Sequence, residues 1–115
     1  MRIAVLSDVH GNLSALDAVL DNLRSRQVDQ LVVLGDHVSG AVDPGGCAAR
    51  LMALGATIIR GNHDRWAVDN SLRGAGSSDR FARGRLNAAQ LDWLASLPAT
   101  AWVGSNVFLC HGTPD

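Results

Sequence analysis

Apolar positions along this chain follow two different spacings. Short apolar runs at residues 3–7, 31–34 and 57–59 predict strands, and the first, with its β-branched members, is typical of a strand buried on both faces of a sheet. Leucine and valine recur at helical spacing over residues 13–23, and a second helix is expected over residues 44–54. The order β-α-β-α-β, with short connections, predicts a parallel sheet with right-handed crossovers.

Local side chains mark the ends of these two helices. Asn12 can accept hydrogen bonds from the free N–H groups at the start of the first helix. Asp43 followed by Pro44 combines a favourable N-cap with a proline at the first helical position. Gly55 fits the C-terminal cap of the second helix.

The pattern changes after Gly61. Residues 70–85 mix Asn, Ser, Gly and Arg without a regular period, which predicts a mobile surface segment with a short helix near Asp79. Residues 87–90 resemble a capping box that opens a helix ended by Pro98. Two short strands, joined by a Gly-Ser-Asn turn, are then expected near residues 101–103 and 107–110.

The composition is that of one globular domain. Of 115 residues, 47% are hydrophobic and 18% charged, which suits a packed core and excludes a disordered chain. The net charge of −1 gives no basic field to attract nucleic acid. No apolar run approaches the roughly 20 residues that cross a bilayer. Cys47 and Cys110 are isolated in apolar surroundings, and no signal peptide opens the chain, so we expect buried, reduced thiols and a cytoplasmic location.

Polar side chains that can bind metals follow each predicted strand. The carboxyl ends of parallel strands meet at one edge, where open α/β sheets bind ligands. Asp8 and His10 are two residues apart in an extended segment, so both can reach one ion. The candidate metal ligands are Asp8, His10, Asp36, Asn62 and His111. A mixed set of oxygen and nitrogen donors suits divalent transition metals, and an aspartate can bridge two of them.

Each of these positions also has a structural explanation. Asp8 is a good helix cap, Asp36 can satisfy N–H groups of a turn, and Asn62 is a favoured turn residue. His37 is expected to pack at the surface or within a loop. The arginines near residues 60–85 are expected to be solvated, although a guanidinium can bind a phosphate with two hydrogen bonds.

His63 is the candidate catalytic residue. It lies beside Asn62 but points elsewhere, and it could donate a proton to a leaving oxygen. Asp64 could orient His63, or it could stabilise the start of a helix.

Taken together, four motifs resemble the calcineurin-like metallophosphoesterases. In chain order they are Asp8-Val9-His10, Gly35-Asp36, Gly61-Asn62-His63-Asp64 and His111-Gly112. The resemblance covers most of the chain, and residues 7–13 and 111–114 are similar to the small bacterial phosphodiesterase (YfcE-like) branch. It implies an α/β fold, the metallophosphoesterase-type αββα sandwich. This chain would form its N-terminal part: the parallel sheet and the start of the second sheet.

The same resemblance implies a reaction. Family members hydrolyse phosphoesters, here most of all phosphodiesters, by in-line attack of a metal-bound hydroxide at a two-metal site. Asp8 and His10 would bind the first metal and Asp36 both. Asn62 and His111 would bind the second metal, and His63 would assist the leaving group. Two divalent ions are implied, manganese first, with iron, nickel, zinc or magnesium as alternatives. The partner would be a small phosphoester substrate.

Two departures from the family pattern change this expectation. Where some relatives carry an aspartate that pairs with the catalytic histidine, this chain has Ser39, so His63 is expected to lack that partner. The family's final Gly-His-x-His motif is absent, so each metal would lack one imidazole. We therefore expect a single domain, residues 1–115, that is C-terminally incomplete. It should expose apolar sheet surface and tend to form homo-oligomers.

Other functions follow from the same departures. The chain could be a catalytically incomplete fragment, or a non-catalytic binding module on the same fold. A third possibility is another enzyme on a doubly wound sheet, such as a phosphotransferase that holds one magnesium ion mainly through carboxylates and waters.

Overall fold

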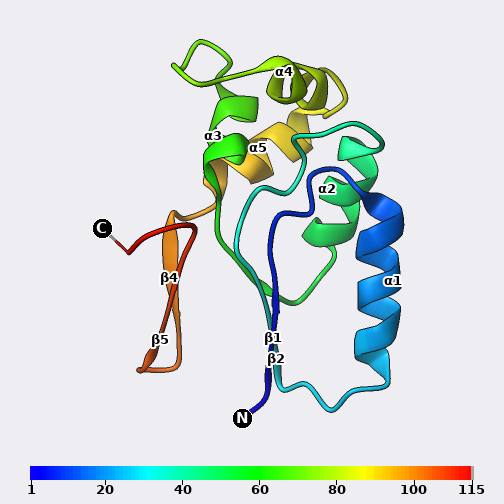
Figure 1. The fold of residues 1–115 in the computed structure, drawn as a ribbon, viewed down its shortest axis with the longest axis vertical. Helices are drawn as coiled ribbons and strands as arrows, with labels where there is room; N and C mark the ends of the chain where they lie inside the picture. The colour runs from blue at the N-terminus through cyan, green and yellow to red at the C-terminus, as the bar shows by residue number, and fades with distance from the viewer. Residues whose placement is uncertain (115) are drawn as a thin grey trace.

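A three-stranded parallel sheet forms the centre of the molecule. The computed structural model describes residues 1–114. Strands β1 (Ile3–Leu6), β2 (Gln30–Val33) and β3 (Thr57–Ile58) pair in the order β1-β2-β3, all parallel. The predicted β-α-β-α-β unit is therefore confirmed (Figure 1).

Helices α1 (Leu13–Arg24) and α2 (Pro44–Met52) pack on one face of this sheet (Figure 1). Asn12 caps α1 by accepting from the N–H of Ala15 at 3.0 Å, as predicted. Asp43 caps α2 in the same way, by accepting from the N–H of Gly46 at 2.8 Å. The predicted cap at Gly55 is wrong. The helix ends at Met52 with Ala53 in right-handed conformation (φ −83°), so its end requires no glycine.

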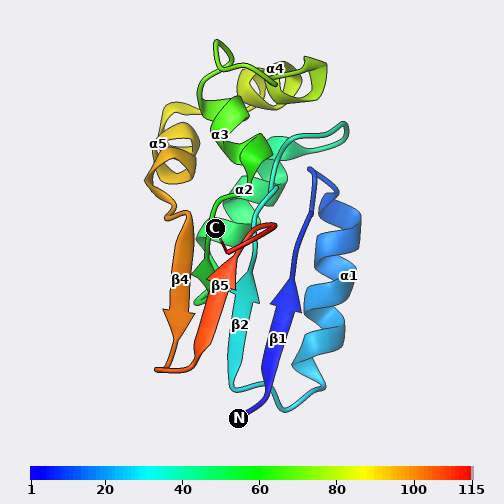
Figure 2. The same cartoon turned by 60° about the vertical axis from the view of Figure 1, so that its left-hand side comes forward.

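An antiparallel hairpin covers part of the opposite face. Its strands are β4 (Thr100–Val103) and β5 (Val107–Cys110), close to the predicted bounds. Val103 and Leu109 of the hairpin pack against Val32 and Ile59 of the first sheet. The order of layers is helix, sheet, sheet, which agrees with the N-terminal part of an αββα sandwich. In Figure 2 the arrows of β1, β2 and β5 point toward the same end of the molecule.

Three further helices lie beyond the carboxyl ends of the strands (Figure 1). They are α3 (Asn62–Val68), α4 (Ser77–Gly84) and α5 (Ala88–Ser96). The short helix expected near Asp79 is confirmed as α4, but Asp79 is buried rather than part of a surface segment. The capping box of α5 is also confirmed, since Asn87 and Gln90 exchange hydrogen bonds between side chain and backbone.

Strand β1 is not buried on both faces, contrary to the sequence-based prediction. The hairpin packs over Val32 and Ile59 and leaves Val5, in the middle of β1, 59% exposed. Val19 on α1 is also exposed, although its spacing predicted an inward position. Among residues 1–114, no helix combines the length and the hydropathy that crossing a membrane would require.

Candidate metal centre

The loops that follow β1 and β2 are joined by backbone hydrogen bonds. The N–H of Asp8 donates to the carbonyl of Gly35 at 3.0 Å, and the N–H of His10 donates to that of Asp36 at 2.9 Å. A third bond of 3.0 Å runs from the N–H of Gly11 to the carbonyl of His37. This backbone ladder continues the pairing of β1 with β2 past the ends of the strands. It fixes the first two motifs side by side.

Three residues in these loops adopt left-handed backbone conformations. The φ angles are 57° at Asp8, 48° at His10 and 58° at Asp36. Such conformations cost about 1–3 kcal/mol each for residues other than glycine, and they cluster at functional sites. The same three side chains offer ligand atoms that all lie within 4.8 Å of one another. Strained backbone and converging ligands therefore coincide.

The first group of ligands consists of Asp8, His10 and Asp36. The Nε2 atom of His10 lies 3.6 Å from Asp8 Oδ1 and 3.6 Å from Asp36 Oδ2. Its Nδ1 atom lies 2.6 Å from the carbonyl oxygen of Ser39. Because a carbonyl only accepts, the hydrogen is on Nδ1, and Nε2 faces the carboxylates with its lone pair. A hydrogen-bonded Nδ1 of this kind commonly orients a histidine ligand toward a metal.

The second group consists of Asp36, Asn62 and His111. The Nε2 atom of His111 lies 3.5 Å from Asp36 Oδ2 and 3.1 Å from Asn62 Oδ1. Its Nδ1 atom donates to the carbonyl of Leu34 at 2.6 Å, so Nε2 again presents a lone pair. With both rings neutral, as metal ligands are, acceptor atoms face acceptor atoms in both groups, an arrangement that a cation would stabilise. The donor set therefore fits divalent metals.

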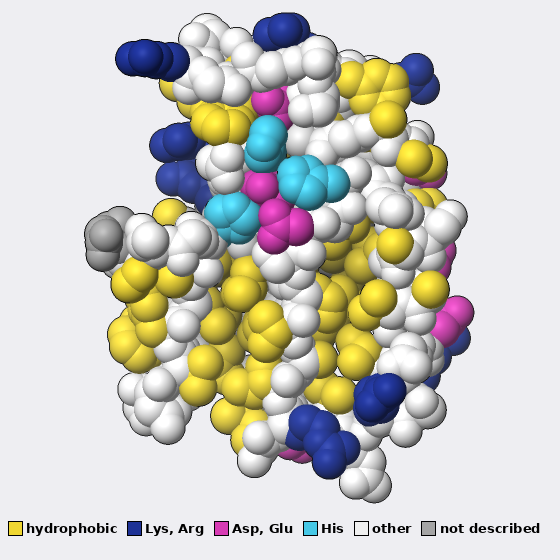
Figure 3. Space-filling view, in the orientation of Figure 1, with side chains coloured by type: hydrophobic (Ala, Val, Ile, Leu, Met, Phe, Trp, Pro, Cys, Tyr) yellow, Lys and Arg dark blue, Asp and Glu magenta, His cyan; other side chains and the backbone are white. Residues whose placement is uncertain are grey.

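The structure brings all five candidate ligands together. Asp36 Oδ2 lies between the imidazoles of His10 and His111, which is the position of a bridging ligand. Figure 3 shows histidine and aspartate side chains gathered in one surface cluster, with an apolar surface below it. The binding roles of these residues stay predictions, but their convergence is a feature of the fold.

A second buried aspartate, Asp64, holds the cluster in place. Its Oδ2 atom accepts from the N–H groups of Asp36 and Gly61, both at 2.7 Å. Its Oδ1 atom accepts from the N–H of His37 at 2.8 Å. Asp64 therefore stabilises the start of α3 and ties it to the loop after β2. Of the two roles considered for it, the structure favours the helix start.

Two glycines allow the motifs to approach one another closely. A Cβ atom on Gly61 would lie 2.1 Å from Asp36 Oδ1, and one on Gly35 would lie 2.5 Å from the backbone nitrogen of Gly61. Gly35 also has a left-handed φ of 108°. A larger residue at position 61 would displace Asp36, and one at position 35 would displace Gly61 or the ring of His111.

His63 has a carboxylate partner, contrary to the sequence-based expectation. Its Nδ1 atom lies 2.7 Å from Oδ1 of Asp79, which comes from α4. The same oxygen accepts from the hydroxyl of Ser39 at 2.7 Å, and Oδ2 accepts from the N–H of Gly76 at 2.6 Å. Asp79 is fully buried. The sequence carries no local sign of this contact, because Asp79 is 16 residues from His63 and 40 from Ser39.

The hydrogen bonds at Asp79 keep it ionised. Burial raises the pKa of this carboxyl, but hydrogen bonds from Gly76, His63 and Ser39 outweigh burial, and the pKa lies below its ordinary value. The imidazole of His63 is 30% exposed, and its ring centroid is 5.4 Å from that of His10. His63 therefore lies at the edge of the metal cluster, with its Nδ1 side against a carboxylate.

The fourth histidine, His37, is a core residue. It is fully buried in the loop after β2, so the predicted loop position is confirmed and the surface position is wrong. Its Nε2 atom donates to the carbonyl of Ile59 at 2.8 Å, and its ring lies 5.9 Å from that of Trp93. Its Nδ1 atom has no hydrogen-bond partner within residues 1–114. The arrangement ties the loop after β2 to the end of β3.

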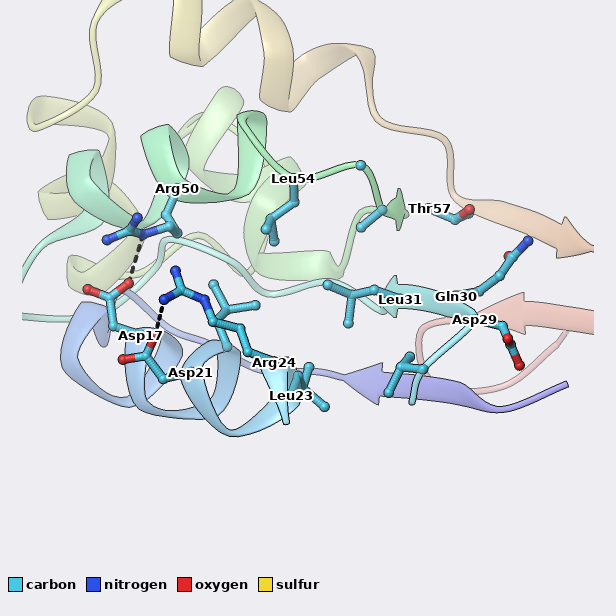
Figure 4. A pocket seen from close by; sticks show the side chains of 14 residues that line it. Asp17, Asp21, Leu23, Arg24, Asp29, Gln30, Leu31, Arg50, Leu54 and Thr57 are labelled. Carbon is cyan, nitrogen blue, oxygen red and sulfur yellow. Dashed lines mark ion pairs between the residues drawn. The ribbon is translucent and has the colours of Figure 1, made fainter. Parts of the chain in front are cut away.

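A separate groove runs between α1, α2 and the beginning of β2 (Figure 4). Arg50 pairs with Asp17 across the two helices at 2.7 Å, and Arg24 pairs with Asp21 at 3.3 Å. None of the candidate metal ligands lines this groove. The groove is therefore separate from the candidate metal centre.

Comparison with known proteins gives a consistent family. The family model for calcineurin-like phosphoesterases matches residues 1–115. The chain is 33% identical to serine/threonine-protein phosphatase 1 of Salmonella typhimurium, over 98% of this chain and 50% of that protein. It is also 40% identical to an uncharacterised protein of Methanocaldococcus jannaschii, over 54% of this chain and 26% of that protein.

Solved structures give the same result. A metallophosphoesterase of Sphaerobacter thermophilus superposes with a TM-score of 0.73 at 35% identity, over 90% of this chain and 44% of that one. A protein described as a candidate diadenosine tetraphosphatase superposes with a TM-score of 0.76 at 29% identity, over 96% of this chain and 49% of that one. The chain thus spans half or less of each of these proteins.

Proposed function

This chain belongs to the calcineurin-like phosphoesterase family, and from that premise we propose that it carries the metal centre of a metal-dependent phosphoester hydrolase. The observation that carries the proposal is the convergence of four further ligand side chains around Asp36. Both histidines are fixed with Nε2 toward the acidic oxygens. This set of donor atoms fits the binding of cations better than it fits hydrogen bonding to the N–H groups of turns.

Two divalent cations would share Asp36. Asp8 and His10 would complete the first site, and Asn62 and His111 the second. Three protein ligands for each ion leave positions open for water and substrate, which is a property of catalytic metal sites. We place manganese first, and iron, nickel, zinc and magnesium remain alternatives. Bound there, the cations would lower the pKa of coordinated water and offset the charge of the phosphoryl oxygens.

His63 would protonate the leaving group. Its imidazole lies at the edge of the cluster, partly exposed, and its backbone N–H donates to Asp36 Oδ1 at 3.0 Å. This bond ties the position of His63 to the bridging ligand. A histidine there can give a proton to the departing oxygen, a contribution of about 10²–10⁴-fold in rate.

Phosphodiesters come first among the proposed substrates. Within residues 1–114, the ion pairs of arginine involve Asp17 and Asp21 and none of the candidate ligands. A phosphodiester carries a single negative charge, whereas a phosphomonoester carries about 1.5 to 2 at neutral pH and gains more from extra cations. A diester therefore gains less from cations besides the metals, which supports its place before the monoester.

The decisive variant is Asp36→Asn. Hydrolysis of bis(4-nitrophenyl) phosphate and of 4-nitrophenyl phosphate is measured with added Mn²⁺, and Asp92→Asn, an exposed position on α5, is the control. Loss of the bridging carboxylate should lower kcat/KM by about 100-fold or more, because several kcal/mol of transition-state stabilisation disappear. Activity equal to that of the control would show that Asp36 does not bridge. A preference for the monoester would reject the diester assignment.

Calorimetric titration with Mn²⁺ separates the hydrolase from its alternatives. Two ions bound for each chain, with one lost in Asn62→Ala, would support the two-metal site. A single bound ion would indicate a catalytically incomplete fragment. No binding at all would favour a non-catalytic module on the same fold.

A further inference from the structure

A chain of hydrogen bonds, Ser39–Asp79–His63, connects helix α4 to the edge of the metal cluster. We propose that Asp79 is the positioning residue for His63: its carboxylate holds one imidazole hydrogen on Nδ1, so that the doubly protonated ring gives its Nε2 hydrogen to the leaving oxygen and returns to the neutral Nδ1–H form. The catalytic part of this inference rests on the proposed function. The tautomer that it assigns to His63 can be measured without any reaction.

The contact itself has the geometry of a charge-assisted hydrogen bond. Asp79 Oδ1 and His63 Nδ1 are 2.7 Å apart. An ionised carboxylate only accepts, so the hydrogen of this bond belongs to Nδ1. Nε2 of His63 makes no hydrogen bond to any of residues 1–114, and the ring is partly exposed. Nε2 is therefore the nitrogen that can meet a substrate, and it carries no hydrogen when the ring is neutral.

Asp79 is itself fixed on both oxygens. Gly76 donates its backbone N–H to Oδ2 at 2.6 Å, and Ser39 donates its hydroxyl to Oδ1 at 2.7 Å. The side chain is fully buried, so water does not compete for these bonds. On its other side, His63 is held by Trp66, whose ring meets it edge to face at a centroid distance of 4.8 Å. The imidazole is thus oriented by α4 and by α3 together.

Ser39 connects Asp79 of α4 to the loop after β2. Its hydroxyl lies 2.7 Å from Asp79 Oδ1 and 3.2 Å from the carbonyl of His63. Serine offers a donor beside His63 but no negative charge. In this chain two residues share the interaction with His63: Asp79 provides the negative charge, and Ser39 holds the Asp79 carboxylate in place by a hydrogen bond.

The substitution Asp79→Asn should reverse the tautomer of His63. The backbone N–H of Gly76 can only donate, so it will select the carbonyl oxygen of the new amide. The amide NH₂ group must then face Nδ1 of His63. Nδ1 becomes an acceptor, and the hydrogen moves to Nε2. An isosteric change of one atom should therefore alter the chemistry while the shape of the site is kept.

The test uses NMR on the metal-free chain with ¹⁵N-labelled histidine, at a pH at which the ring carries one hydrogen. The His63 signals are assigned from their absence in His63→Gln. We expect the hydrogen on Nδ1 in the wild type and in Asp92→Asn, and on Nε2 in Asp79→Asn. A wild-type hydrogen on Nε2 would overturn the proposal, and this measurement does not require any Asp79 variant to fold.

Kinetics with Mn²⁺ and a phosphodiester test the catalytic part. In Asp79→Asn, kcat should fall by about 100-fold or more, with KM changed by less than about threefold. The fall should be larger for an alkyl than for a nitrophenyl leaving group, because only the poor leaving group needs the proton. Ser39→Ala keeps the carboxylate and should lose less than about tenfold. A folded Asp79→Asn variant with wild-type kcat would refute the catalytic role.

These results separate this inference from the proposed function. If the hydrogen lies on Nδ1 but the chain has no hydrolytic activity, the proposed function is contradicted and the orientation of His63 by Asp79 is retained. If the chain is active but the hydrogen of His63 lies on Nε2, the proposed function is retained and the orientation by Asp79 is contradicted.

Discussion

At the scale of single residues, burial decides how side chains of the same type behave. Asp64 and Asp79 are fully buried and accept hydrogen bonds on both oxygens, while Asp92 is exposed. The two cysteines differ in the same way. Cys47 is buried in the core beneath α1, and Cys110, just before His111, is only partly buried, where the sequence suggested that both would be buried.

This difference predicts selective alkylation of the thiols. Burial, followed by the nearby carboxylates of Asp43 and Asp17, raises the pKa of Cys47 to about 11, so almost none of it is thiolate at pH 8. Iodoacetamide should modify Cys110 in the native protein, and Cys47 only after unfolding. Mass spectrometry of the digested protein measures both. Equal labelling of the two cysteines without denaturant would contradict the buried position of Cys47.

At the scale of elements, local signals predicted some helices and missed others. Helices α1, α2 and α5 could be predicted from Asn12, Asp43 and Asn87, because each of these side chains caps the helix that begins at the next residue. Helices α3 and α4 follow glycines without a side-chain cap; α3 was indicated only by the helix-start role considered for Asp64, and α4 only as a short helix near Asp79.

The site likewise contains residues that local sequence signals predict and residues that they do not. The ligands could be predicted because each follows a strand, and parallel strands end at one edge. The supports of the site could not. Asp64 contacts Asp36 across 28 residues and Asp79 contacts Ser39 across 40, and no spacing rule connects such positions. Only the packing of α3 and α4 brings them together.

The close approach of α3 to the loop after β2 predicts the effect of Gly61→Ala. The new Cβ atom would overlap Asp36 Oδ1, so the bridging carboxylate must move. We expect Mn²⁺ affinity to fall by about tenfold to 100-fold, as it does when the supports of metal ligands are lost. Calorimetry measures the affinity. Gly84→Ala is the matched control, since its Cβ atom meets nothing within 4 Å and should stabilise α4 by about 0.5–1 kcal/mol. Equal affinity in the two variants would refute the steric argument.

At the scale of the whole molecule, the apolar surface beside the site is the main liability. Val5 in the middle of β1 and Val19 on α1 are exposed and line one shallow hollow that reaches Asp8. Contiguous apolar surface of this kind promotes association between chains. Figure 3 shows apolar surface below the polar cluster.

We therefore predict reversible self-association through the face of β1. Sedimentation velocity across a range of protein concentrations should show species larger than the 12.1 kDa chain, and Val5→Lys should shift them toward the monomer. Val42→Lys is the control, because Val42 is more exposed but precedes α2 and lies outside this hollow. A monodisperse monomer at every concentration would contradict the prediction, as would an equal effect of both variants.

The backbone ladder between the loops after β1 and β2 has a consequence for the evolutionary history of such a site. Every bond in it joins an amide hydrogen to a carbonyl, groups that all amino acids except proline share. A residue that accepts the left-handed φ of Asp8, His10 or Asp36 can therefore replace it without removing any bond of the ladder. The loops can keep their shape while the ligands that they carry change.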